Sequence, residues 1–87
     1  MKFTCPCCGY KTLKNKPPGT FEICKICFWE DDSSQFYNPD FKEGLNEISL
    51  REAQQNFTKI GACKKRFENY VQKPTKNDIK DPQWKIL

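Results

Sequence analysis

Short apolar runs and turn residues alternate through the amino-terminal third of the chain. Residues 10–13 (Tyr-Lys-Thr-Leu) and 20–23 (Thr-Phe-Glu-Ile) are β-prone and alternate in polarity, and residues 15–19 (Asn-Lys-Pro-Pro-Gly) between them are typical of a turn. We therefore predict a β-hairpin over residues 1–30. Its strands would bring the cysteines before the first run close to those after the second.

Residues 28–47 show neither helical nor strand periodicity. Large aromatic side chains are interspersed there with Asp, Ser, Asn and Pro, namely Phe28, Trp29, Phe36, Tyr37 and Phe41. This composition predicts a long aromatic and acidic loop, which its aromatic side chains anchor against the rest of the fold.

A helix is predicted to begin after Ser49, because Ser49 and Glu52 have the spacing of a capping box. The apolar positions that follow are three or four residues apart and share one helical face: Leu50, Ala53, Phe57 and Ile60. Gly61 suits the left-handed residue that ends a helix. A second, shorter helix is predicted over residues 63–71. Its inward side chains are those of Phe67, Tyr70 and Val71, and Pro74 stops it.

The pattern as a whole predicts a small α+β metal-stabilised domain over residues 1–74. It consists of a zinc-ribbon-like β-hairpin, the long aromatic and acidic loop, and two C-terminal helices that form a helical hairpin over residues 48–72. Residues 75–87 are expected to be a polar C-terminal tail, in which Trp84, Ile86 and Leu87 are the candidates for docking.

Six cysteines supply the most specific chemical signal. Cys5 and Cys8 are three positions apart and precede Gly9, and Cys24 and Cys27 repeat this spacing after about 15 intervening residues. Two such pairs are typical of zinc knuckles, in which each pair binds the ion through its thiolates. We predict that these four cysteines hold one structural Zn²⁺.

Other uses of the cysteines remain open. The two pairs could hold iron, as in rubredoxin-type electron carriers, although Phe28 replaces the glycine that usually follows the second pair. A disulfide scaffold is disfavoured by the adjacency of Cys7 and Cys8 and by the lack of an export signal. Cys7 could also replace Cys8 as a ligand. Cys63 is expected to be a small side chain in or near the core.

Composition narrows the class of protein. Only 37% of the 87 residues are hydrophobic, so the core is small and a metal would add stability. The chain has no histidine for Ser-His or Cys-His catalysis, and a four-thiolate metal has no open position for a substrate. We therefore expect a binding protein rather than an enzyme. Without a signal-peptide core or a long apolar run, it is expected to be cytoplasmic and not to span a membrane.

Residues 29–32 are a candidate partner-binding segment. Trp29, Glu30, Asp31 and Asp32 place three carboxylates beside an aromatic side chain, which suits a basic protein surface or weak binding of Mg²⁺. The alternative is a solvated turn in which Trp29 covers the metal site.

Four motifs together resemble those of the bacterial cysteine-rich CPCC family: Cys5-Pro6-Cys7-Cys8-Gly9-Tyr10, Pro17-Pro18-Gly19-Thr20-Phe21-Glu22-Ile23-Cys24, Cys27-Phe28-Trp29-Glu30-Asp31-Asp32, and Ser49-Leu50-Arg51-Glu52-Ala53 with Asn56-Phe57. The likeness runs from about residue 3 to residue 74, and the chain departs from the family pattern at Cys63 and in its tail. The resemblance implies metal binding through the two cysteine pairs in a bacterial protein. The family has no established activity. Some members accompany toxin systems as immunity proteins, which implies a protein partner.

The leading functional hypothesis is a zinc-stabilised protein-interaction module, with an immunity or inhibitor protein as one form of it. The alternative is a nucleic-acid-binding zinc ribbon that uses the basic residues Lys11, Lys14, Lys16, Lys25, Lys64, Lys65 and Arg66. The formal net charge is +4, but acidic residues in the middle of the chain interrupt the basic face that nucleic acid requires. An iron electron carrier is the third hypothesis.

Overall fold

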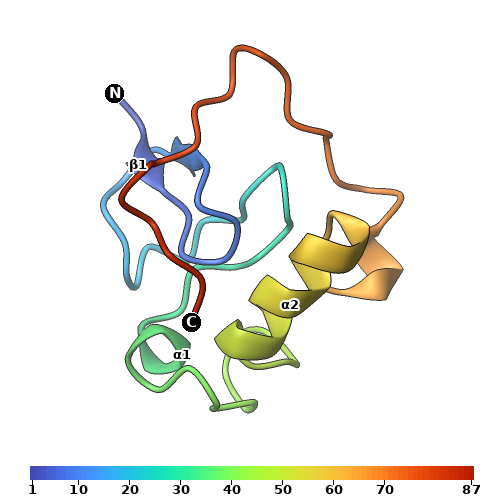
Figure 1. Cartoon of the computed structure of the whole chain (residues 1–87). Helices are drawn as coiled ribbons and strands as arrows, with labels where there is room; N and C mark the ends of the chain where they lie inside the picture. Colours follow the sequence, from blue (N-terminus) through green and yellow to red (C-terminus); the bar gives the residue numbers. More distant parts are fainter.

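The computed structural model describes residues 1–87 as a small α+β domain that measures 33 × 26 × 20 Å (Figure 1). Its elements are short, and they are, in chain order, β1 (Phe3–Thr4), β2 (Lys11–Leu13), α1 (Ser33–Tyr37), α2 (Leu50–Ile60) and the 3₁₀ turn η1 (Lys65–Phe67). None of these helices combines the length and the apolar character that crossing a membrane requires. Most of the chain is irregular, so contacts between loops and the cysteine cluster hold the fold together.

The strand pairing differs from the predicted hairpin. β1 and β2 pair antiparallel, with Phe3 opposite Leu13, and the first cysteine pair lies in the turn between them. The predicted second strand pairs instead with the segment that follows the second cysteine pair, because Cys24 N donates to Trp29 O at 3.0 Å. Each cysteine pair thus forms the tip of its own small hairpin. We call these tips the first knuckle (residues 5–9) and the second knuckle (residues 24–28). A CxxC turn closes a hairpin of a few residues at a lower entropy cost than pairing across a longer loop.

The predicted helix at Ser49 is confirmed in α2. The Ser49 hydroxyl accepts from Glu52 N at 3.1 Å, and Gly61 ends the helix with a left-handed φ of 75°. Leu50 and Ala53 are buried on the predicted face. Ile60 at the end of that face is exposed, and the buried Gln54 was not predicted from the apolar pattern.

The second predicted helix is wrong, since only the single turn η1 forms within residues 63–71. Backbone bonds to the second knuckle compete with helix formation on both sides of this turn. Cys63 N donates to Cys27 O at 2.8 Å, and Gln72 N donates to Lys25 O at 2.9 Å. Phe67 packs against the core as predicted, whereas Tyr70 is exposed.

The predicted loop over residues 28–47 contains the helix α1, which Asp32 precedes as the N-cap residue. The Asp32 carboxylate accepts from Gln35 N, an N-cap that the Asp-x-x-Gln spacing could have revealed. Gln35 is fully buried, and the two N–H groups of its side-chain amide are shared among three loop carbonyls, those of Phe41, Asn46 and Ile48. A buried glutamine therefore anchors this loop together with two of the predicted aromatic anchors, the buried Trp29 and Phe28, which packs against the core. Phe36 and Tyr37 are exposed.

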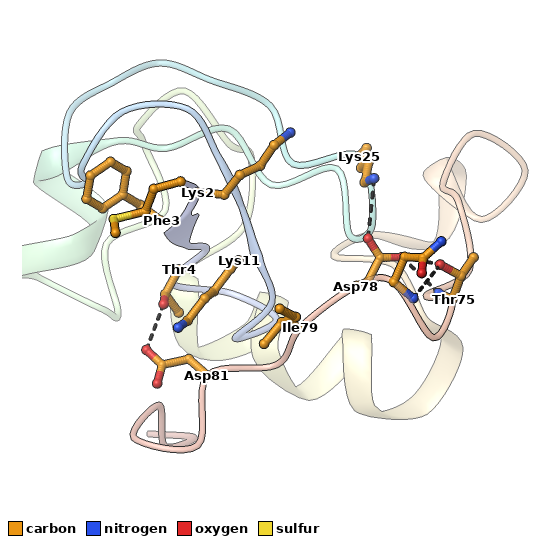
Figure 2. Close-up of a pocket in the computed structure, with 11 residues that line it drawn as sticks. Lys2, Phe3, Thr4, Lys11, Lys25, Thr75, Asp78, Ile79 and Asp81 are labelled. Atoms are coloured by element: carbon orange, nitrogen blue, oxygen red, sulfur yellow. Dashed lines mark hydrogen bonds and ion pairs between the residues drawn. The ribbon is translucent and has the colours of Figure 1, made fainter.

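Residues 75–87 return across the first knuckle. Lys11 N donates to Ile79 O at 2.9 Å, which adds a third segment beside β2. The Thr4 hydroxyl donates to the Asp81 carboxylate at 2.7 Å, as Figure 2 shows. Trp84 lies over Gly9, where an added Cβ would come within 2.6 Å of the indole ring. The C-terminal segment therefore covers the first knuckle.

We predict that Gly9→Ala destabilises the protein more than Gly61→Ala. Both glycines have a left-handed φ, of 81° and 75°, so alanine costs about 1 kcal/mol at either position. Only at Gly9 would the new methyl group meet the Trp84 ring, which adds about 1–3 kcal/mol of overpacking. Urea unfolding of the two variants measures the difference. Equal losses of stability would mean that Trp84 does not lie against Gly9.

Candidate metal centre

Two knuckles with the same backbone geometry position the four cysteines of the predicted site. Gly9 N donates to Cys5 O at 2.9 Å, and Phe28 N donates to Cys24 O at 2.7 Å. Gly9 has a φ of 81° and Phe28 a φ of 72°. The second knuckle therefore forms without the glycine that this turn favours, because Phe28 takes the left-handed conformation instead.

The four sulfur atoms of Cys5, Cys8, Cys24 and Cys27 all lie within 4.8 Å of one another. Two of these distances cross between the knuckles, 3.6 Å from Cys5 Sγ to Cys27 Sγ and 3.7 Å from Cys8 Sγ to Cys24 Sγ. Zinc–sulfur bonds of about 2.3 Å place the sulfurs of a tetrahedral site about 3.8 Å apart. These cysteines are thus positioned to coordinate one metal ion. All six cysteines are free thiols, in contrast to the disulfide alternative.

The burial of this cluster and the pKa shifts of its thiols favour a bound cation. All four cysteines are 0–1% exposed. Burial raises the pKa of the Cys5 and Cys27 thiols well above their usual range, and hydrogen bonding with Cys24 raises the pKa of Cys8. Hydrogen bonds from the other thiols, chiefly that of Cys27, lower the pKa of Cys24. Four thiolates in a site as buried as this one require a bound cation.

A family model described as cysteine-rich CPCC matches residues 3–78. The chain belongs to the cysteine-rich CPCC family. A search of curated proteins found no match. The matched range contains both knuckles, α2 and the start of the C-terminal segment.

The CPCC motif divides its four residues between the metal centre and the core. Cys5 and Cys8 face the second knuckle, and Cys7 is buried outside the group of four converging sulfurs. The Pro6 carbonyl accepts two hydrogen bonds of 2.9 Å, from Gln54 Nε2 and from Trp84 Nε1. α2 and the C-terminal segment therefore hold the backbone of this knuckle in place.

The CPCC cluster has one polar neighbour that the sequence analysis did not identify. The Thr12 hydroxyl donates to Cys24 Sγ at 3.0 Å from β2. A hydroxyl donor to a thiolate partly offsets its charge and fixes its orientation, as groups around bound metals commonly do. Nothing in the local pattern distinguishes Thr12 from any other threonine on a strand, because the contact depends on how the two knuckles meet.

Cys63 is buried beside the cluster but is not one of the four converging cysteines. Burial raises the pKa of its thiol to about 12, so the thiol keeps its proton at neutral pH. This agrees with the expected small core residue and does not suit a nucleophile.

The predicted partner-binding segment is largely buried in the CPCC fold. Trp29 is 1%, Asp31 0% and Asp32 8% exposed, while Glu30 is half-buried. Asp31 accepts from the backbone and hydroxyl of Thr20, and Asp32 accepts at the start of α1. These side chains therefore stabilise the return strand of the second knuckle and do not form an accessible contact surface. The carboxylates do not converge on a magnesium site, since the cysteine cluster is the group of candidate ligands that the fold brings together.

We predict that Cys24→Ser abolishes tight metal binding by this CPCC protein, whereas Cys63→Ser leaves one metal ion per chain. Both cysteines are buried, but only Cys24 belongs to the group of four. Metal analysis of the purified variants measures the stoichiometry, and amide dispersion in NMR spectra measures the folding of residues 1–30. Equal metal content in both variants would contradict the assigned ligands.

Thr12→Val is expected to lower the metal affinity about 10- to 100-fold while the fold is retained. The substitution keeps the shape of the side chain and removes the hydroxyl that faces Cys24. Thr58→Val is the matched control, because the Thr58 hydroxyl bonds only to the Gln54 carbonyl within α2. Competition with a chromogenic chelator compares the two affinities. An unchanged affinity in Thr12→Val would show that this hydroxyl does not support the site.

Proposed function

We propose that this protein binds one structural Zn²⁺ through Cys5, Cys8, Cys24 and Cys27 and acts as a protein-interaction module. The observation that carries the proposal is the set of four buried sulfurs at tetrahedral spacing. Such a site has no open position, so the metal serves folding and not catalysis. Its binding free energy, on the order of 10 kcal/mol in small zinc motifs, adds directly to the stability of the fold.

Burial of the site favours zinc over an iron electron carrier. A tetrahedral four-thiolate site suits either metal. An electron carrier, however, must bring an edge of its metal site close to a redox partner, and here all four ligand side chains are 0–1% exposed. The zinc role needs no such access.

Acidic side chains that lie among the basic ones weigh against the nucleic-acid alternative, because they interrupt a phosphate-binding face. Lys25 pairs with Asp78 at 3.3 Å, and Lys64 and Arg66 both pair with Glu47 at 2.7 Å. Lys2 and Lys11 line a cleft between β1 and residues 75–81, where Asp78 and Asp81 are interleaved with them (Figure 2). The basic residues thus do not form a continuous phosphate-binding face.

Exposed apolar side chains support a protein partner. Three large exposed side chains, those of Ile23, Leu45 and Tyr70, line cavities beside the second knuckle. Aromatic residues such as Tyr70 are enriched in protein interfaces. The resemblance to family members that accompany toxin systems makes an inhibited or neutralised protein the first class of partner to test.

Native mass spectrometry of the purified protein tests the metal assignment. We expect a mass excess of one zinc ion per chain in a colourless preparation, and loss of amide dispersion when a strong chelator removes the metal. A red preparation that contains one iron would overturn the zinc role. A chain that stays folded without metal would overturn the structural role.

A further inference from the structure

Three aromatic rings surround the tip of the second knuckle. The ring of Phe28 lies 5.0 Å from that of Phe67 and 6.1 Å from that of Tyr70, measured between centroids. The Arg66 guanidinium stacks 5.0 Å from the centroid of Phe67. These four residues line an open hollow of about 490 Å³, which we call the aromatic hollow.

A narrower apolar slot of about 160 Å³ adjoins the aromatic hollow. The two share Phe28, Arg66 and Phe67. The other apolar residues of the slot come from the second knuckle, the loop before α2 and the segment after it: Ile23, Leu45, Ile48 and Cys63. An apolar cavity of about 150 Å³ accommodates a benzene molecule. The slot is therefore large enough for one phenyl-sized side chain.

Phe28 lines both the slot and the hollow and has a backbone conformation that favours glycine. Its φ is 72°, and the equivalent position of the first knuckle is Gly9. Glycine would strain this backbone less, so what phenylalanine contributes here is its ring, which packs against the core cluster and also lines both cavities. Residues held in such conformations cluster at functional sites.

The charges around the hollow favour a carboxylate. Arg66 is the single charged residue of the aromatic hollow, and its side chain is 60% exposed. Arg66 and Lys64 share one oxygen of Glu47, which leaves other guanidinium N–H groups free to bind a carboxylate. The charges that line the slot sum to zero, because Glu30 and Glu47 offset Lys64 and Arg66. A cationic ligand such as a methylated lysine would be repelled by Arg66.

We propose that the slot and the hollow are the docking site for a protein partner that inserts one aromatic side chain into the slot and places a neighbouring carboxylate on Arg66. This inference rests on the protein-interaction role proposed above and names the site and the chemistry of the partner. Phe28 and Phe67 bind the inserted ring through aromatic packing, and Arg66 selects an acidic neighbour.

An NMR titration of zinc-loaded protein tests this proposal with three capped pentapeptides: Gly-Asp-Phe-Asp-Gly, Gly-Asp-Gly-Asp-Gly and Gly-Lys-Phe-Lys-Gly. We expect saturable shifts only with the first, at amides lining the two cavities, such as those of Ile23, Leu45 and Phe67. Binding of the second or the third peptide as tight as that of the first would overturn the proposal, as would shifts that map elsewhere on the protein.

Variants separate docking from folding. Phe28→Gly suits the left-handed backbone and removes the ring, so we expect a folded, zinc-loaded protein that binds the first peptide at least tenfold more weakly. Arg66→Glu is expected to have the same effect on binding. Tyr37→Ala is the control, because this exposed ring lies outside both cavities, and its binding is expected to be unchanged. Full binding by Phe28→Gly and Arg66→Glu would overturn the proposal.

Two further outcomes are distinguishable in the same samples. Native mass spectrometry reports the zinc content, so a folded, zinc-loaded protein that binds none of the peptides overturns the docking site and leaves the zinc role intact. Saturable binding of oligothymidine at the same amides, falling steeply with salt, would assign the site to nucleic acid and overturn the protein partner.

Discussion

Four buried thiols can all become charged ligands only around a shared cation, and the rest of this fold is arranged around that constraint. Only 19 of the 87 residues are buried, and the six cysteines are all among them. Apolar packing on this scale gives a marginal core for a chain of this length. Because the cysteines occupy the place that aliphatic side chains fill in larger domains, the free energy of binding a metal at this site would compensate for the small apolar core.

The C-terminal half depends on the same centre, because it is attached to the knuckles through backbone hydrogen bonds. Cys63 N bonds to the second knuckle at Cys27 O, and Asp81 N bonds to the first knuckle at Gly9 O. The side chain of Gln54 brings α2 to the carbonyl of Pro6. Ordering of the knuckles by a metal therefore fixes the acceptors that segments distant in sequence require.

Patterns of a few neighbouring residues predicted those features of the fold that neighbouring residues determine. The spacing of the cysteine pairs predicted the four sulfurs that converge, and Ser49 and Gly61 predicted both ends of α2. The errors concern segments whose partners are distant. Residues 63–71 have a helical pattern, but hydrogen bonds to the second knuckle replace most of the helix. Burial of Asp31 follows from its place on the return strand of a hairpin, whereas composition favoured a partner-binding segment or a solvated turn for residues 29–32.

The two knuckles have the same backbone conformation but differ in which side chains cover them. This difference indicates which end of the molecule is free to bind another molecule. At the first knuckle, Gly9 leaves space that Trp84 fills from within the chain. At the second, the Phe28 ring projects beside Phe67 and Tyr70, and no other segment closes the aromatic hollow. Glycine at the second tip would strain the backbone less but would remove a ring that packs against the core cluster. The part of the Phe28 ring that stays uncovered at this tip is the part that the proposed docking site would use.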